Sequence, residues 1–294
     1  DQRLSRGLGD VYKRQVGMIS HLGPQMGIAD GIALAKKLKK EKQSTVVFTG
    51  DGGTSEGDFH EALNVASVWN LPVLFVIENN GYGLSTPNEE QFKGDSLAIR
   101  GDGYGIESLS IDGNNLLEVY TTVKEKLENI RKDPSPVLIE CYTFRMRGHE
   151  EASGTKYVPK EVMEYWAKKD PVINYENYLL KEKVYTKEEI EKIKAEIKDE
   201  INDAVKQSFD GKPFVVNAES EVEDVFYPYT QKVNFPSSKS ISEKRYVDAI
   251  SDGLRQSMNR YKDMVIMGQD ISDYGGVFKV TEGFVDEFGR ERVR

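Results

Sequence analysis

Residues 46–86 read VVFTGDGGTSEGDFHEALNVASVWNLPVLFVIENNGYGLST, and this stretch decides the fold. Its opening apolar, β-branched residues predict a buried strand that runs into a glycine turn at residues 50–53. We expect Thr54 or Ser55 to cap the helix that follows, because hydroxyl side chains accept from free amides at a helix start. The stretch therefore begins as strand, turn and helix.

A second buried strand is predicted for residues 73–77, directly after Pro72. It ends at the polar residues Glu78, Asn79 and Asn80. The glycine turn and this polar cluster each follow a strand, so in a parallel sheet both lie at the carboxyl edge. Open α/β sheets bind their ligands at that edge.

The composition excludes several classes of protein. The chain has 294 residues, 38% of them hydrophobic, which is enough for one large core or two modest ones. A net charge of -9 argues against a nonspecific nucleic-acid binder. The single cysteine, Cys141, lies in an apolar run, allows no disulfide framework and suits a reducing cytoplasm. No apolar stretch long enough to span a membrane is present, so we expect a cytoplasmic protein without a membrane partner.

Helices and buried strands alternate along the rest of the first half. Residues 16–31 form a glycine-punctuated turn leading into a helix, and residues 114–132 have helical spacing. The run 137–144 predicts a third buried strand. This alternation indicates a doubly wound parallel α/β domain. A charged helical region follows, in which Thr186 and Glu189 form a capping box.

Both ends of the chain are unusual. Residues 1–15 show no periodicity, and GLGDVYKRQ resembles translated adapter sequence, so we interpret this leader as non-native. Residues 211–240 are rich in proline and acidic residues and are interpreted as a linker. A new pattern begins near Ile241, with a helix and a strand at 264–267, and stops at Arg294. We therefore expect that a second α/β domain starts there and is cut short.

The glycine turn is a candidate phosphate site. Backbone amides of Gly52 and Gly53 precede a helix and can bind an anion. A nucleotide P-loop is excluded, because the lysine that it requires is missing after these glycines. A dinucleotide fold fits better, since Glu78 ends the next strand where a ribose-binding acid belongs. A simple tight turn also remains possible.

Asp51 argues against the dinucleotide interpretation. A carboxylate inside a diphosphate cradle places like charges together, and burying an unpaired charge costs at least several kcal/mol. A cation removes this conflict. Mg²⁺ prefers one or two carboxylates, phosphate oxygens and neutral oxygen ligands. Asp51, Asn80 and a backbone carbonyl just beyond Asn80 provide such a set.

The spacing of GDG and NN resembles the thiamine diphosphate motif. The wider text, GDGGTSEGDFHEALNVASVWNLPVLFVIENNGYGLSTP, is similar to the α-subunit of the decarboxylating component of 2-oxo acid dehydrogenase complexes. The similarity is dense over residues 16–171. It implies a thiamine diphosphate-binding fold and a small 2-oxo acid as substrate.

This resemblance implies a role for each matching residue. Asp51, Asn80 and the carbonyl of Tyr82 would hold Mg²⁺, and the amides of Gly52 and Gly53 would meet the diphosphate. Leu84 would be the apolar support beneath the cofactor, and Ser20 and Leu22 would form the turn at the aminopyrimidine. His149 would be the loop histidine near the diphosphate and the lipoyl group.

The carboxyl-terminal part resembles the start of the β-subunit of the same enzyme, so the chain looks like a fusion of α and β. Where the family has Gly-Glu-Asp or Gly-Glu-Glu, this chain has Gln269 at the middle position, and no role transfers to it. The family's catalytic glutamate would lie just beyond Arg294. Glu150 occupies the position of a phosphorylatable serine of some relatives, which argues against kinase control of that kind.

Together these observations predict the following organisation and activity. The intact protein would decarboxylate a 2-oxo acid oxidatively, with branched-chain acids preferred and pyruvate next, and would transfer the acyl group to a lipoyl-bearing acyltransferase core. We expect a homo-oligomer when the protein is intact, and an inactive fragment otherwise. The rival hypotheses are a nicotinamide-dependent dehydrogenase and a catalytically incomplete assembly domain. The expected parts are a leader at 1–15, a diphosphate-binding domain at 16–172 lacking its upstream part, a helical extension at 173–210, a linker at 211–240 and the truncated start of a pyrimidine-binding domain at 241–294.

Overall fold

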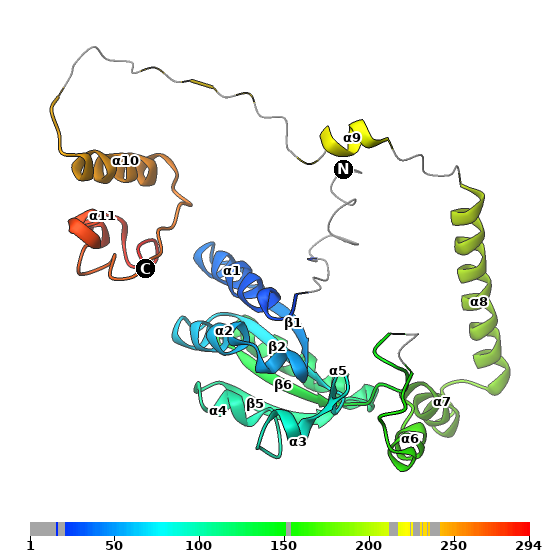
Figure 1. Cartoon of the computed structure of the whole chain (residues 1–294). Helices are drawn as coiled ribbons and strands as arrows, with labels where there is room; N and C mark the ends of the chain where they lie inside the picture. The colour runs from blue at the N-terminus through cyan, green and yellow to red at the C-terminus, as the bar shows by residue number, and fades with distance from the viewer. Residues whose placement is uncertain are drawn as a thin grey trace. The chain divides into compact units, whose positions relative to one another are not determined.

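The computed structural model describes residues 16, 21–150, 154–211, 217–223, 225, 230, 232–233, 235 and 242–294. The chain divides into two compact units, Asp1–Lys206 and Gln207–Arg294. Figure 1 shows the sheet and most of the helices in the first unit.

A four-stranded parallel sheet forms the centre of the first unit (Figure 1). Its strands are β1 (Thr45–Gly50), β2 (Val73–Asn79), β5 (Glu107–Asp112) and β6 (Val137–Tyr142). Their order across the sheet is β1-β2-β6-β5, and every neighbouring pair is parallel. The predicted α/β class and parallel sheet are confirmed.

Helices cover both faces of this sheet, as a doubly wound fold requires. Helices α1 (Pro24–Leu38) and α2 (Gly57–Val68) contribute to one hydrophobic cluster, and α5 (Leu116–Lys132) contributes to the other. The alternate residues of β2 divide between them: Phe75 and Ile77 lie in the first cluster, Leu74 and Val76 in the second. A strand buried on both faces explains its unbroken apolar sequence.

Two local predictions differ from the structure. Strand β5 was not recognised in the sequence, although its apolar residues alternate with serines as in a half-exposed strand. The expected cap at Thr54 or Ser55 is wrong, because Gly52–Ser55 forms a 3₁₀ turn, η1, and Glu56 is the N-cap of α2. The hydroxyl of Thr54 instead donates to the backbone oxygen of Asp51, at 2.6 Å.

The segment between β2 and β5 is more ordered than a plain loop. It contains an antiparallel pair, β3 (Tyr82–Gly83) and β4 (Thr86–Pro87), followed by the single turns α3 (Asn88–Gln91) and α4 (Ile99–Asp102). These short elements hold the polar cluster after β2 in one conformation. The site is therefore built from short, hydrogen-bonded turns at the carboxyl edge of the sheet.

Three helices follow the sheet: α6 (Lys160–Ala167), α7 (Pro171–Lys181) and α8 (Lys187–Asp210). The predicted capping box at the start of α8 is confirmed. The amide of Thr186 donates to Glu189 Oε2 at 2.8 Å, and the amide of Glu189 donates to Thr186 Oγ1 at 3.2 Å. Most of the apolar stripe on α8 is exposed, as at Ile197 and Ile201.

The second unit contains α9 (Ala218–Glu223), α10 (Tyr246–Arg260), η2 (Val277–Lys279) and α11 (Phe284–Phe288). Its core gathers around three buried side chains, Met258, Phe284 and Val293. The strand predicted for residues 264–267 is wrong: within 242–294 the only β pairing is an isolated parallel bridge between Ile266 and Val293. A single bridge is too short to count as a strand.

Candidate functional site

Asp51 lies at the carboxyl end of β1 and is 2% exposed. Its carboxylate oxygen Oδ2 has no hydrogen-bond partner among the described residues. Burial raises the pKa of Asp51 above its ordinary value, and hydrogen bonds from the backbone of Asn80 and the side chain of Gln91 offset this only in part. A buried carboxylate with a free oxygen is the arrangement expected of a cation ligand.

The two glycines after Asp51 are required by close packing. A Cβ on Gly53 would lie 2.3 Å from Thr49 Oγ1, and one on Gly52 would lie 3.1 Å from the Cα of Gly83. The turn after β1 therefore meets the β3 segment backbone to backbone. This contact places Asp51 next to the loop that carries Asn80 and Tyr82.

The two asparagines after β2 have different surroundings. Asn79 is buried, and its Oδ1 accepts from the amide of Gly81 at 3.1 Å and from Asn88 Nδ2 at 2.7 Å. Asn80 is half-buried, and its Oδ1 accepts from the amide of Tyr82 at 3.2 Å. A carboxamide oxygen has two lone pairs, so Asn80 retains one for a ligand. Asn79 shapes the loop, whereas the backbone of Asn80 donates a hydrogen bond to the carboxylate of Asp51.

Leu84 has an unusual backbone for a branched residue. Its φ is 59°, and its side chain is 58% exposed. Such a conformation costs about 1–3 kcal/mol when no glycine is present. The carbonyl of Leu84 accepts from Arg145 Nη2 at 2.9 Å, which helps to hold the turn. An exposed apolar side chain on a strained turn is typical of a ligand contact.

His149 is brought close to the same turn by Arg145. Arg145 Nη1 lies 3.2 Å from His149 Nδ1, and Arg145 Nη2 donates to the hydroxyl of Tyr157 at 3.1 Å. The ring of Tyr157 packs edge-on against that of Tyr82, with 5.7 Å between centroids. The loop after β6 and the loop after β2 therefore share one cluster, with His149 exposed at its rim.

The amino-terminal predictions fare differently. Ser20 lies outside the described residues. Leu22 is 56% exposed and precedes Gly23, where a Cβ would lie 2.8 Å from that of Asp58 in α2. Between the described residues, no hydrogen bond connects Leu22 to the Asp51 cluster. Hydrogen bonds, ring packing and close backbone contact link Asp51, Gly52, Gly53, Asn80, Tyr82, Leu84 and His149, whereas the role of Leu22 stays a prediction.

Sequence reasoning missed two residues of the site. Gln91, from α3, favours the charged form of Asp51 through a hydrogen bond, and its Oε1 would lie 2.9 Å from a Cβ on Gly83. Glu140, from β6, is fully buried and accepts from Asn79 Nδ2 at 2.7 Å. An acid inside the apolar run of β6 was a visible signal in the sequence. Gln91 had none, because its role depends on loop folding.

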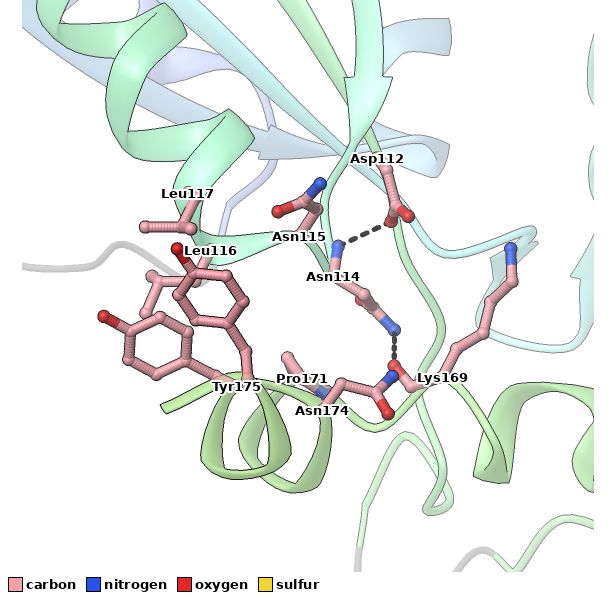
Figure 2. Close-up of a pocket in the computed structure, with 10 residues that line it drawn as sticks. Asp112, Asn114, Asn115, Leu116, Leu117, Lys169, Pro171, Asn174 and Tyr175 are labelled. Carbon is pink, nitrogen blue, oxygen red and sulfur yellow. Dashed lines mark hydrogen bonds between the residues drawn. The ribbon is translucent and has the colours of Figure 1, made fainter. Parts of the chain in front are cut away.

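A separate cleft lies at the carboxyl end of β5. It has a volume of about 250 Å³ and is closed on one side by α7. Figure 2 shows Asn114 in its floor, where Nδ2 donates to the carbonyl of Lys169 at 2.8 Å. None of the sequence-predicted site residues lines it. The lining residues are Asp112, Asn114, Asn115, Leu116, Leu117, Lys169, Pro171, Asn174, Tyr175 and Tyr178.

The described residues contain neither a cluster of classical metal-binding side chains nor a membrane-spanning helix. In the described part of the chain, no group of three or more His, Cys, Asp or Glu side chains is arranged to bind a metal. The set around Asp51 differs in kind, because it combines one carboxylate with amide and carbonyl oxygens. The same residues include no helix long and apolar enough to cross a lipid bilayer.

The fold places a buried carboxylate and a glycine turn at the carboxyl edge of a parallel sheet, and comparison with known proteins gives the family. A family model described as "Dehydrogenase E1 component" matches residues 8–214. The chain belongs to this family. Its members depend in general on thiamine diphosphate.

The similar proteins are α-subunits. The α-subunit of acetoin:2,6-dichlorophenolindophenol oxidoreductase from Bacillus subtilis (strain 168) is 39% identical over 76% of this chain and 67% of its own length. The pyruvate dehydrogenase E1 α-subunit of Acholeplasma laidlawii is 38% identical, over 63% of this chain and 54% of its own. The 3-methyl-2-oxobutanoate dehydrogenase α-subunit of Mycobacterium tuberculosis (strain CDC 1551 / Oshkosh) is 35% identical, over 72% and 58%. The chain thus spans roughly half to two thirds of these relatives.

Proposed function

We propose that this chain provides the diphosphate-binding part of an enzyme that decarboxylates a 2-oxo acid oxidatively and passes the acyl group to a lipoyl carrier protein. One observation carries the proposal. Asp51 Oδ2 is buried without a partner among the described residues, beside a glycine turn and next to Asn80. A divalent cation bound to a diphosphate accounts for all three features.

The residues present fit Mg²⁺. Asp51 Oδ2, the side-chain oxygen of Asn80 and the carbonyl of Tyr82 would hold it, and the hydrogen bond from the amide of Tyr82 already orients Asn80. Mg²⁺ keeps several ligands from phosphate and water, so three protein oxygens are sufficient. The bound cation would also lower the pKa of Asp51, because it stabilises the charged form.

The cofactor would lie across the neighbouring turns. Thiamine diphosphate, when bound, supplies the carbanion and the electron sink that decarboxylation needs. The amides of Gly52 and Gly53 would bind its diphosphate, and Leu84 would support its apolar part. Ser20 and Leu22 would meet the aminopyrimidine, a role that stays a prediction. His149, held by Arg145, would bind near the diphosphate and receive the lipoyl group.

Substrate and partners are part of the same proposal. Branched-chain 2-oxo acids are our first choice and pyruvate the second; the relatives' names include both types, and acetoin as well. The second unit would be the start of a β-subunit-like domain, and the whole enzyme an oligomer bound to a lipoyl-bearing acyltransferase core. The residues named above would then form half of each active site.

Ligand binding with and without a chelator tests the proposal directly. Calorimetric titration of the full chain with thiamine diphosphate is expected to show binding only when Mg²⁺ is present. Inorganic pyrophosphate with Mg²⁺ should bind at the same site, more weakly. Binding of a nicotinamide dinucleotide in the presence of EDTA would refute the assignment in favour of the dehydrogenase alternative.

A second measurement separates an enzyme from an assembly domain. The chain, supplied with a β-subunit and a lipoyl carrier, is assayed with 3-methyl-2-oxobutanoate, pyruvate and acetoin. Turnover of 3-methyl-2-oxobutanoate or pyruvate that depends on Mg²⁺ and thiamine diphosphate supports the proposal, whereas turnover of acetoin alone would contradict the assignment of a 2-oxo acid substrate. Tight cofactor binding with no turnover of any of the three would favour the incomplete assembly domain.

A further inference from the structure

Glu140 is a buried anion held entirely by neutral donors. Its side chain lies in β6 and is completely inaccessible to solvent. Five donors bind the carboxylate. Oε1 accepts from Asn79 Nδ2 at 2.7 Å and from the amide of Leu97 at 3.1 Å. Oε2 accepts from the amide of Ala98 at 3.2 Å, from the hydroxyl of Ser110 at 2.6 Å and from the hydroxyl of Ser96. Burial alone would raise the pKa of Glu140, but bonds from Ser110, Ser96, Asn79 and Leu97 outweigh it and lower the pKa.

One arm of this cluster leads to the loop after β2. Asn79 donates to Glu140, so its Nδ2 points into the sheet and its Oδ1 faces the loop. That oxygen accepts from the amide of Gly81 and from Asn88 Nδ2. Gly81 has a φ of 84°, and the next residue, Tyr82, donates its amide to Asn80. The orientation of Asn79 thus determines where Asn80 and Tyr82 lie.

The other arm leads to the turn after β1. The amides of Leu97 and Ala98, which bind Glu140, immediately precede α4. Arg100 in α4 donates through Nη1 to the carbonyl of Thr54 in η1. Thr54 is fully buried, and its hydroxyl donates to the backbone oxygen of Asp51 at 2.6 Å. Hydrogen bonds and the short backbone segment 97–100 therefore connect Glu140 to the backbone of Asp51 as well.

We propose that Glu140 is the positioning residue of the Mg²⁺–diphosphate site, because its one carboxylate fixes both the loop that carries Asn80 and Tyr82 and the helix that braces Asp51. The inference rests on the proposed function. Because Glu140 is fully buried and both its oxygens accept from protein donors, it would touch neither the metal nor the cofactor. Partners of metal ligands of this kind set ligand orientation, and their loss costs about 10- to 100-fold in metal affinity.

The carboxylate is required because it only accepts hydrogen bonds. Glu140→Gln keeps the size of the side chain but replaces one acceptor oxygen by an NH₂ group. Whichever way the amide turns, a donor then faces either Asn79 Nδ2 and the amide of Leu97, or the amide of Ala98 with the hydroxyls of Ser96 and Ser110. One arm loses its anchor in either orientation.

The test compares the full chain with three variants. Mg²⁺-dependent binding of thiamine diphosphate is measured by calorimetry, and unfolding by circular dichroism. Glu140→Gln is expected to weaken binding about 10- to 100-fold. Ser110→Ala is the matched control, because it removes one donor to Oε2 without touching either arm, and it should change binding by less than about 3-fold. The third variant, Glu140→Gln/Asn79→Asp, places the hydrogen-bond donor at position 140 and the acceptor at position 79, and it keeps the net charge.

The double variant separates positioning from general stability. It restores a hydrogen bond between positions 140 and 79 and keeps an oxygen facing Gly81 and Asn88, while the amide of Leu97 alone loses its acceptor, so we expect binding within about 5-fold of the original chain. Equal binding by Glu140→Gln and the original chain overturns the inference. So does a folded double variant that binds no better than Glu140→Gln.

Hydrogen exchange gives a result without any ligand. The amides of Gly81 and Tyr82 are expected to exchange about 10-fold faster in Glu140→Gln and to recover in the double variant. Unchanged exchange at both amides overturns the inference. If the original chain binds no Mg²⁺ with thiamine diphosphate or pyrophosphate, the proposed function fails, whereas the exchange data still decide whether Glu140 orders the loop.

Discussion

Asp51 combines full burial with a negative charge and an oxygen that has no partner among the described residues. Burying an uncompensated charge is unfavourable, so the charged side chain of Asp51 destabilises the folded protein when no cation is bound. The raised pKa of Asp51 reports the same conflict. Replacing Asp51 should therefore change the stability of the metal-free protein and its affinity for the metal in opposite directions.

Asp51→Asn should therefore stabilise the metal-free chain and weaken ligand binding. We expect a gain of about 1 kcal/mol in the free energy of unfolding at pH 8, from urea denaturation, and a loss of at least about 10-fold in Mg²⁺-dependent thiamine diphosphate affinity. Glu61→Gln, at an exposed carboxylate of α2, is the control and should change neither quantity. A variant that binds normally would remove Asp51 from the metal site.

Asp30 predicts a pH dependence of stability. It is 5% exposed in α1, its Oδ1 has no partner in the described structure, and burial raises its pKa from 3.8 to about 7. The folded state therefore keeps the proton that the unfolded state releases between these values. Stability falls as pH rises from about 4 to about 7, by up to about 4 kcal/mol, and is level above.

Asp30→Asn is expected to flatten this dependence, and urea unfolding at pH 4.5, 6 and 8 measures it. Above pH 7 the variant should be the more stable protein, because no charge is buried at position 30. Part of the slope will remain, since the pKa of Asp51 is raised in the same direction. An unchanged slope would show that Asp30 is solvated in the folded protein.

At the scale of elements, the turn between β1 and η1 depends on close backbone contact. Gly53→Ala places a Cβ 2.3 Å from Thr49 Oγ1, and we expect a loss of about 1–3 kcal/mol in unfolding free energy. Gly57→Ala is the matched control in α2: its Cβ meets nothing within 4 Å, and alanine favours a helix. The second change should be neutral or mildly stabilising.

A double-mutant cycle identifies the cause. Thr49→Ala removes the oxygen that the new methyl group would strike, so Thr49→Ala/Gly53→Ala should recover most of the stability that Gly53→Ala loses. Strictly additive losses would mean that another contact, or backbone conformation, makes Gly53 necessary.

On the scale of the whole molecule, each unit has a core of its own. The first unit contains the sheet with clusters on both faces, and the second has a small cluster around Met258, Phe284 and Val293. We expect two calorimetric transitions, with the smaller core melting at the lower temperature. Phe284→Ala should lower only that transition, and Leu63→Ala only the other, each costing about 3–5 kcal/mol. A single transition shifted by both variants would contradict this.

The fold was largely predictable from the sequence because its signals are local. The apolar runs of β1, β2 and β6 and the capping box of α8 depend on neighbouring residues only. Strand β5 was missed because it is half-exposed and its serines dilute the pattern. The prediction of a strand at 264–267 was wrong because an apolar segment forms a strand only when a neighbouring segment pairs with it over several residues. Here only a single bridge forms.

By itself, the sequence determined the alternation of strands and helices, and with it the meeting of the GDG turn and the asparagine pair at one edge of a parallel sheet. Turn glycines and hydrophobic periods act over a few residues. Only the tertiary structure decided which polar groups meet. Glu140 and Asn79 are 61 residues apart, and Ser110 lies 30 from Glu140. They come together because the strand order is β1-β2-β6-β5, which sets β6 between the strands that carry its partners. Strand order follows from packing of both sheet faces, and no local pattern encodes it.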